Sequence, residues 1–391
     1  MHLQDQTYGE GVPHGGRRGW VILLAVVGLA LLASRLFRPA GEADLILPGP
    51  GVTEVIPLSH YFPPLAQTPG DTAVYVLDSG QPGGTAVILG GTHADELAGI
   101  VTAVLVVENA QPRQGRLFVI PHANASAITH TLPMEGTPHR VTIPLPDGSA
   151  RTFRVGSRLT NPLHQWPDPV VYVHAASGQQ LSGSDTRNLN RSYPGRPDGT
   201  LTEQVAYAIT QLILQEEADL VIDLHEASPE YPVINTIVAH PRAMDLAAWV
   251  ALEVEMEGMA IGLEPSPESL RGLIHRELGE ATPALVVLME TANPAQGRLR
   301  GRTDAALVVE GRDPTYVKAG RIGRLYVPFD EEGHPLHGRV ARHLTALQAF
   351  LRNVGLFADG RPIVVEGLPT YTDLMEHGLG AFLRSPATGR P

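Results

Sequence analysis

Residues 85–108, TAVILGGTHADELAGIVTAVLVVE, decide the fold class. TAVIL is a short apolar run typical of a buried strand, and from Asp95 to Glu108 the apolar residues recur at helical spacing. A tight Gly90-Gly91-Thr92 turn joins the two segments. The stretch therefore predicts a strand followed directly by a helix, which is the repeating unit of an α/β protein.

The same alternation continues along the chain. Further apolar runs predict buried strands, and amphipathic stretches between them predict helices, one of which begins with a possible capping box from Thr200 to Glu203. The predicted strands are 116–120, 220–224 and 284–289, and the predicted helices are 201–217 and 241–263. We therefore expect a largely parallel or mixed twisted sheet with helices on both faces, whose ligands collect at the carboxyl ends of the strands.

Composition excludes several classes of protein. The 391 residues carry a formal charge of −12, are 43% hydrophobic and include no cysteine. Nothing in this balance indicates a disordered chain or general affinity for nucleic acid, and thiolate chemistry is impossible. The single lysine, Lys318, precedes alanine, so no P-loop exists, and neither GxSxG nor GxGxxG occurs.

An apolar run near the N-terminus, Trp20 to Ser34, is flanked by arginines. Its length falls between that of a signal-peptide core and that of a full membrane span. We expect a tail over 1–19, a transmembrane anchor or signal segment over 20–37, and a flexible Pro/Gly-rich linker over 38–70. A single-pass membrane protein with an extracytoplasmic catalytic domain is the default, with secretion after cleavage or a buried soluble helix as alternatives.

The remainder is expected to form one large domain. We assign residues 71–330 to the catalytic domain, with a β-rich insertion over about 131–183, because this part of the chain is rich in Pro, Gly, Thr and Val. Residues 331–391 are expected to add a C-terminal helix and an appendage.

Two histidines and one glutamate form a candidate metal site. His93 and Glu96 are three residues apart where a predicted loop enters a helix, and His225 follows the strand 220–224. Two imidazoles and a carboxylate form the usual catalytic zinc set, with a fourth position open for water. Either Asp223 or Glu226 would orient the second ring nitrogen of His225. Taken singly, a chance HxxE or a hydrogen-bonded core histidine explains each piece.

Two other motifs supply candidate partners for such a site. Glu290 follows the apolar run ALVVLM, where an unpaired carboxylate is costly as core filling, and it can act as a general base. Asn190 and Arg191 lie in a polar, Gly-rich stretch, and Arg191 offers a bidentate clamp for a substrate carboxylate. A solvated turn is the alternative interpretation of this pair.

Together GGTHADE, NLNR, DLHE and MET, in this order, resemble the succinylglutamate desuccinylase/aspartoacylase family, in particular its predicted deacylases, which are related to the zinc carboxypeptidases. The resemblance covers roughly residues 85–293. It implies a zinc-carboxypeptidase-like fold and one Zn²⁺ ion. The residues implied as zinc ligands are His93, Glu96 and His225, with Glu290 as general base and Asn190 and Arg191 as the pair that binds the substrate carboxylate.

This sequence departs from the family pattern at three points. Ala94 replaces the usual Gly after the first histidine, and Asn188 stands where the family often has Asp. The oxyanion-stabilising arginine has no clear match. Arg187 is preferred for its proximity to the NLNR motif, and the other candidates are Arg158, Arg271 and Arg276.

The resemblance implies a zinc-dependent hydrolase that cleaves an N-acyl amide bond in a small, carboxylate-bearing substrate, with Glu290 taking a proton from metal-activated water. The alternative is a membrane-anchored zinc carboxypeptidase acting on exported or cell-wall peptides, which would need an open groove rather than a small cavity. A degenerate, non-catalytic binding module is the second alternative. A membrane partner is expected only through residues 20–37.

Overall fold

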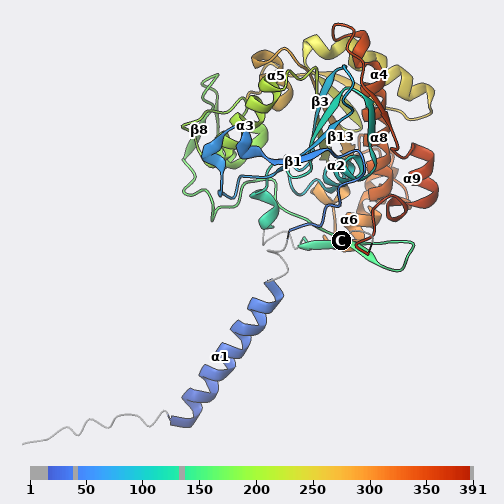
Figure 1. Cartoon of the computed structure of the whole chain (residues 1–391). Helices are drawn as coiled ribbons and strands as arrows, with labels where there is room; N and C mark the ends of the chain where they lie inside the picture. Colours follow the sequence, from blue (N-terminus) through green and yellow to red (C-terminus); the bar gives the residue numbers. More distant parts are fainter. Residues whose placement is uncertain (1–15, 38–42, 132–136, 388–391) are drawn as a thin grey trace, which may run out of the picture. The chain divides into compact units, whose positions relative to one another are not determined.

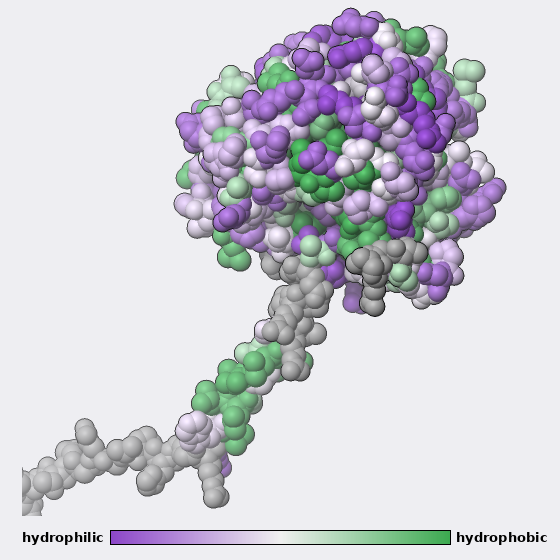
Figure 2. All heavy atoms as spheres, viewed as in Figure 1, coloured by the Kyte–Doolittle hydropathy of each residue, from purple (hydrophilic) through white to green (hydrophobic). Residues whose placement is uncertain are grey.

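The structure is a computed structural model that describes residues 16–37, 43–131 and 137–387. Its internal contacts divide the chain into two units, residues 1–43 and 44–391. The first unit contains helix α1 (Gly16–Phe37), whose described apolar side chains are exposed (Figure 2). Within the described residues, no helix combines the length and hydropathy that crossing a bilayer requires, so the transmembrane anchor predicted over 20–37 is not supported.

The second unit is built on a mixed sheet of eight strands in the order β1-β2-β5-β3-β10-β13-β11-β12 (Figure 1). The central pairs β5-β3, β3-β10 and β10-β13 are parallel, as is β11-β12, whereas β1-β2, β2-β5 and β13-β11 are antiparallel. The strands are β1 (Glu54–Pro57), β2 (Ala73–Asp78), β3 (Thr85–Leu89), β5 (Arg116–Ile120), β10 (Leu220–Ala227), β11 (Thr236–Ala239), β12 (Gly262–Pro265) and β13 (Leu285–Ala292). The α/β class with a mixed sheet is therefore confirmed.

Helices cover both faces of this sheet. One layer contains α2, α4 and α8, which share a core with residues such as Ile88 and Ile222, and the other contains α3 and α5, which pack on residues such as Val87 and Val221. The capping box that starts α3 forms as predicted between Thr200 and Glu203. The helices are α2 (Leu97–Asn109), α3 (Leu201–Gln215), α4 (Met244–Met256), α5 (Ile274–Ala281), α6 (Ala305–Glu310), α7 (Pro314–Arg321), α8 (Leu336–Asn353) and α9 (Tyr371–His377).

The turn from β3 to α2 depends on two glycines. Gly91 has a φ of +68°, a backbone conformation that favours glycine. Gly99 lies against β10, where a Cβ atom would come within 2.3 Å of the Leu224 carbonyl oxygen. This close approach brings the start of α2 beside the carboxyl end of β10, where two of the predicted site motifs lie.

The linker predicted over 38–70 is wrong from Asp44 onward. Strand β1 pairs with β2, and Leu58 and Leu65 are fully buried. The Asp44 carboxylate contacts His122 at 3.0 Å and Arg154 at 3.3 Å. Proline and glycine set the turns in this stretch, while its few apolar residues complete the core, so composition alone suggested a flexibility that tertiary contacts remove.

The C-terminal region is part of the same unit rather than an appendage. Helix α8 packs on α2 and α4, and β14 (Val364–Glu366) pairs with β4 (Gln111–Gln114). The predicted insertion contains two hairpins among its described residues, β6 (Arg140–Pro144) with β7 (Ala150–Arg154) and β8 (Val171–Val173) with β9 (Gln180–Ser182).

Candidate metal centre

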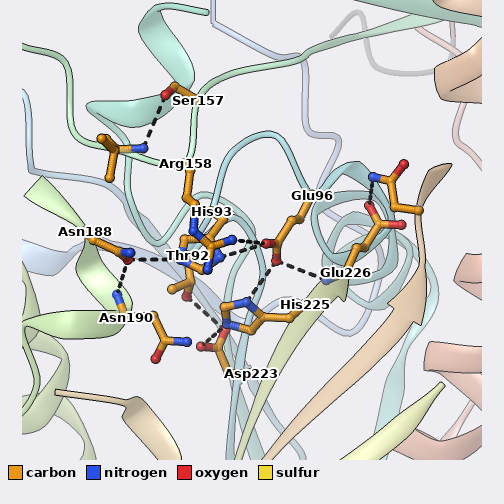
Figure 3. Close-up of polar contacts among 12 residues, drawn as sticks. Thr92, His93, Glu96, Ser157, Arg158, Asn188, Asn190, Asp223, His225 and Glu226 are labelled. Carbon is orange, nitrogen blue, oxygen red and sulfur yellow. Dashed lines mark hydrogen bonds and ion pairs between the residues drawn. The ribbon is translucent and has the colours of Figure 1, made fainter. Parts of the chain in front are cut away.

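His93, Glu96 and His225 meet at the carboxyl edge of the sheet (Figure 3). His93 lies on the turn after β3, Glu96 immediately precedes α2, and His225 lies within β10. The Nδ1 atoms of the two histidines lie 2.7 Å and 2.8 Å from the two Glu96 carboxylate oxygens. All three side chains are only 1% exposed, and one ligand atom from each lies within 4.8 Å of the others.

The second ring nitrogen of each histidine has its own partner. His93 Nε2 lies 3.0 Å from Asn188 Oδ1, and His225 Nε2 lies 2.7 Å from Asp223 Oδ2. The other Asp223 oxygen accepts a hydrogen bond from Thr92 Oγ1. Such partners fix the ring orientation of a metal-binding histidine. Of the two acids left open by the sequence, Asp223 therefore orients His225, and Asn188 does the same for His93.

Burial and charge act differently on the two histidines. Burial, together with the charge of Arg158, lowers the pKa of His93 to about 3. Burial opposes protonation of His225 too, but the charges of Asp223 and Glu96 raise the pKa of its ring well above the usual value. A proton on His225 thus neutralises the buried carboxylates, and a cation bound between the same Nδ1 and carboxylate atoms would replace that proton.

The donor set fits a divalent metal of the zinc type. Zinc accepts imidazole nitrogens and carboxylate oxygens as ligands, and imidazoles whose second ring nitrogen has its own partner are typical of zinc sites. The fold brings together all three ligands predicted from the sequence. The structure shows a group that could hold a metal; the identity of the ion is part of the proposal below.

Glu290 lies beside this group on the neighbouring strand. In the parallel pair β10-β13 it is the direct partner of His225, so the two side chains share one face of the sheet. Its Oε2 is enclosed and has no hydrogen-bond partner in the described part of the chain. Burial, then the charge of Glu96, raises the pKa of Glu290 to about 8. The sequence placed His225 and Glu290 after their strands; both lie within them.

A cavity of about 850 Å³ opens in front of these residues. Asn190 and Arg191, the predicted substrate-binding pair, both line it. Asn190 Oδ1 accepts a hydrogen bond from the backbone amide of Ile274, which fixes the turn that carries the pair. The cavity is lined by His93, Arg158, Asn190, Arg191, Glu226, Ala227, Ser228, Glu230, Tyr231, Val233, Val238, Glu264, Pro265, Pro267, Leu270, Leu273, His275, Leu288, Glu290, Gln296 and Arg298.

The preferred arginine, Arg187, does not line this cavity. Its guanidinium is held by Asp168 at 2.7 Å and 2.8 Å and by the Thr160 carbonyl oxygen at 2.8 Å. Arg158 was another candidate for the oxyanion-stabilising arginine. It does line the cavity, and its NH1 lies 3.1 Å from Glu96 Oε1. The geometry therefore favours Arg158 over Arg187 for a role toward the substrate.

Sequence reasoning missed how Arg158 reaches the site. The Ala94 amide donates to the Ser157 carbonyl oxygen at 3.0 Å, and the Gly156 amide donates to the Ala94 carbonyl oxygen at 2.8 Å. This two-bond contact ties the insertion to the HADE turn, although the two are about sixty residues apart in sequence. His275 was also missed, because it is a single histidine outside the recognised motifs.

Fold and site together define an α/β protein with a potential metal-binding centre at the carboxyl edge of its sheet. Residues 172–281 match the family model described as the succinylglutamate desuccinylase/aspartoacylase catalytic domain. This match covers less than a third of the chain and agrees with the family resemblance that its motifs predicted. The similarity to this catalytic domain is consistent with an enzymatic role.

A curated relative supports the same family. Over 161 residues the chain is 28% identical to the N-alpha-acetyl-L-2,4-diaminobutyric acid deacetylase of Halomonas elongata, a match that covers 40% of this chain. The match spans only about a third of the deacetylase (33%).

Several solved structures are similar at lower identity. They include a succinylglutamate desuccinylase from Silicibacter sp. TM1040 (16% identity, TM-score 0.39, 77% of this chain and 63% of that one). The product-bound ectoine utilization protein EutE (DoeB) from Ruegeria pomeroyi is 22% identical (TM-score 0.35, 58% and 55%). The tripeptide-bound cell shape determinant Csd4 from Helicobacter pylori is 11% identical (TM-score 0.42, 75% and 55%).

Proposed function

We propose that this protein is a zinc-dependent hydrolase that cleaves the amide bond of a small N-acylated substrate bearing a carboxylate. One observation carries the proposal: a buried His93–Glu96–His225 group lies beside Glu290, whose Oε2 has no hydrogen-bond partner in the described chain and which lines the same cavity as His93. An enclosed carboxylate oxygen without a partner is costly, and such groups are concentrated at functional sites. The relative from Halomonas elongata, a deacetylase of an N-acetylated amino acid by name, is consistent with this reaction class.

His93, Glu96 and His225 would hold the ion. When bound, Zn²⁺ would polarise the scissile carbonyl and make water acidic enough to lose a proton near neutral pH. Asp223 and Asn188 keep the two imidazoles turned so that each Nδ1 faces the Glu96 carboxylate. The protein thereby preorganises the ligand set without relying on exposed, mobile side chains.

Glu290 is assigned the proton transfers. It accepts a proton from the attacking water and returns that proton to the nitrogen of the leaving amine, so it ends the cycle in its starting state. Its place opposite His225 in the β10-β13 register puts it next to the ligand group. Its raised pKa, about 8, makes it a stronger base than an exposed glutamate once it has lost its own proton.

Arg158 and Arg191 are assigned to the substrate. Arg158 lines the cavity and contacts Glu96, so its guanidinium lies near the ligand group, where it can stabilise the developing oxyanion. Arg191 lines the same cavity, and the structure gives its guanidinium one hydrogen bond, from NH1 to the Asn190 carbonyl oxygen. The rest of the fork can bind a carboxylate and orient the amide.

The cavity volume favours a small substrate over a long peptide. About 850 Å³ lies within the range of small-molecule sites, roughly 300–1,000 Å³. Short peptides with a free C-terminus also fit that volume, so the carboxypeptidase alternative enters the test as a competing outcome.

The test is a panel of N-acyl amino acids and C-terminally free peptides, assayed with zinc-loaded and with chelated protein. We expect the zinc-loaded protein to release amine from N-acyl amino acids, the chelated protein to be inactive, and added Zn²⁺ to restore turnover. Faster hydrolysis of the peptides would replace the deacylase by the carboxypeptidase. Elemental analysis of the His225→Ala variant should show loss of the metal. A wild-type protein purified without metal, and inactive after loading, would favour the binding module.

A further inference from the structure

His275 is a buried histidine in the wall of the same cavity. It is the second residue of α5 and is 3% exposed, yet it lines the cavity together with Arg191 and Glu290. It belongs neither to the His93–Glu96–His225 group nor to the NLNR motif. Its place in the wall raises the question of which ring atom faces the cavity.

The hydrogen bonds of His275 settle the orientation of its ring. Nδ1 lies 2.7 Å from Ser266 Oγ, whereas Nε2 has no hydrogen-bond partner in the described chain and is not among its fully enclosed unpaired atoms. Nε2 is therefore the atom that faces the cavity. Ser266 itself is fixed, because its amide donates to the Ala239 carbonyl oxygen at 2.8 Å.

The same bond indicates which nitrogen carries the proton. In the described chain the Ser266 hydroxyl has no other hydrogen-bond partner than Nδ1. If Nδ1 carried the proton, the buried hydroxyl hydrogen of Ser266 would lack an acceptor, which costs free energy. When the hydroxyl donates to Nδ1 instead, both groups are satisfied, and the proton of a neutral imidazole lies on Nε2. His275 then offers a hydrogen-bond donor to the cavity.

The ring is held next to the turn that carries Arg191. The amide of Ile274, the residue before His275, donates to Asn190 Oδ1 at 2.9 Å. At Gly272 a Cβ atom would come within 2.1 Å of the Arg191 carbonyl oxygen, so the two backbone segments are in close contact. The start of α5 and the NLNR turn therefore form one rigid wall, with two donor side chains on the cavity.

His275 complements Arg191 without adding a second charge. Burial, together with the charges of His225, Arg276 and Arg191, lowers the pKa of His275 to about 3, so the ring is neutral near pH 7. A neutral donor beside a guanidinium suits a carboxylate, which has two oxygens to share between them.

We propose that His275 Nε2–H and the Arg191 guanidinium together form the subsite that binds the carboxylate of the substrate, with His275 as a specificity-determining residue. The inference deepens the proposed function and rests on it for the presence of an N-acylated, carboxylate-bearing substrate. It assigns to α5 a direct role in selecting acids over the corresponding amides.

The test compares the binding of N-acetyl-L-alanine with that of its carboxamide, N-acetyl-L-alaninamide. Calorimetric titrations use the full-length, zinc-loaded protein carrying Glu290→Gln, so that neither ligand is consumed. Binding is measured in this reference protein and after adding His275→Phe, which fills the space but has no donor, or His275→Gln, which restores an N–H donor. Thermal unfolding confirms that each variant is folded.

A matched control is His240→Asn. His240 is also buried and lies beside Gly279 of α5, but it does not line the cavity. We expect the reference protein to bind the acid more tightly than the amide. His275→Phe should reduce this preference about tenfold, which corresponds to the loss of one hydrogen bond to a charged group. His275→Gln should recover most of the preference, and His240→Asn should keep all of it.

Two results would overturn the inference. One is a reference protein that binds acid and amide equally well; the other is a folded His275→Phe variant with the same preference as the His240→Asn control. Binding does not depend on turnover, so these results differ from failure of the proposed function, which is absence of metal-dependent hydrolysis by the wild-type protein. A preference for the acid that depends on His275 would support the subsite even in a protein without turnover.

Discussion

Two glutamates on neighbouring strands, the buried Glu226 and the half-buried Glu290, have opposite surroundings. The Glu226 carboxylate is paired with Arg339 of α8 and accepts hydrogen bonds from the Ala98 amide at 2.9 Å and Asn293 at 3.2 Å. The Glu290 carboxylate faces the cavity and leaves one oxygen without a partner in the described chain. Glu226 is buried and Glu290 is half-buried, and loss of contact with water raises the pKa of both.

The two glutamates differ because they lie on opposite faces of the sheet. Along β10 and β13 successive side chains alternate between the two faces, so His225 and Glu290 share the cavity face while Glu226 and Thr291 share the face toward α8. Thr291 contacts His343 of α8 at 3.2 Å. On the α8 face the partners of Glu226 hold segments together, whereas the partner that Glu290 lacks is one that a substrate or a water would supply.

The largest effect is expected from breaking the paired glutamate. Arg339→Met should leave Glu226 buried without its counter-charge and lower the free energy of unfolding by about 3–5 kcal/mol, measured by denaturant unfolding. Adding Glu226→Gln to this variant should recover part of the loss. An Arg339→Met protein as stable as the wild type would show that the ion pair does not hold the α8 face together.

Glu290→Gln should have the opposite profile. We expect zinc to stay bound, as measured by elemental analysis, while kcat falls by roughly 100-fold or more, because the base is lost and the ligands remain. Thermal unfolding at neutral pH should show no loss of stability comparable to that of Arg339→Met. Unchanged steady-state kinetics would remove Glu290 from the mechanism.

The pH dependence of stability sharpens the contrast. The folded-state pKa of Glu290, about 8, exceeds its unfolded value of 4.5, so between these pH values the folded metal-free protein binds a proton that the unfolded chain has lost. Stability contributed by Glu290 therefore falls as pH rises through this window. Glu290→Gln should lack this pH-dependent loss of stability. Its free energy of unfolding should therefore rise by on the order of 1–3 kcal/mol relative to wild type between pH 5 and 8.5. Urea unfolding of the chelated wild-type and Glu290→Gln proteins at several pH values tests this. A difference in unfolding free energy that stays constant across pH would contradict it.

The smallest expected effect is a difference in kcat between variants of two arginines, Arg158 and Arg187. Arg158→Gln should lower kcat about tenfold through loss of a group near the reacting carbonyl. Arg187→Gln should leave kcat within about threefold of wild type, because Arg187 is already engaged by Asp168 and lies outside the cavity lining. Steady-state kinetics of both variants test this expectation. A larger loss of kcat in Arg187→Gln than in Arg158→Gln would favour Arg187 as the oxyanion-stabilising arginine, as the sequence suggested.

Much of the fold was predictable because its strands are apolar runs with clear helical segments between them. Strands β3 and β5 match their predicted bounds, and α3 begins at its predicted capping box. The strands β11 and β12 were missed, because four residues carry no usable periodicity. The linker was mispredicted, because pairing of β1 with β2 and burial of Leu58 are long-range contacts that composition does not encode.

Some residues of the candidate site could be predicted from the sequence and others could not. His93, Glu96, His225 and Glu290 were identifiable as candidates, because short motifs at strand ends contain residue types that can bind a metal, and parallel strands bring such ends to one edge. Asn188 as the partner of His93, Arg158 beside Glu96 and His275 beside Arg191 were not. Each depends on loops and helix starts that are far apart in the sequence.

By itself, the sequence determined the α/β alternation, the family resemblance and the order of the candidate metal-binding motifs, because these depend on local apolar periodicity and on residue types at fixed spacing. The tertiary structure decided which ring nitrogens face the Glu96 carboxylate, which of the two glutamates has partners and which arginine reaches the cavity. The physical reason is that hydrogen bonding and burial depend on neighbours supplied by other strands and helices, and no local pattern specifies those neighbours.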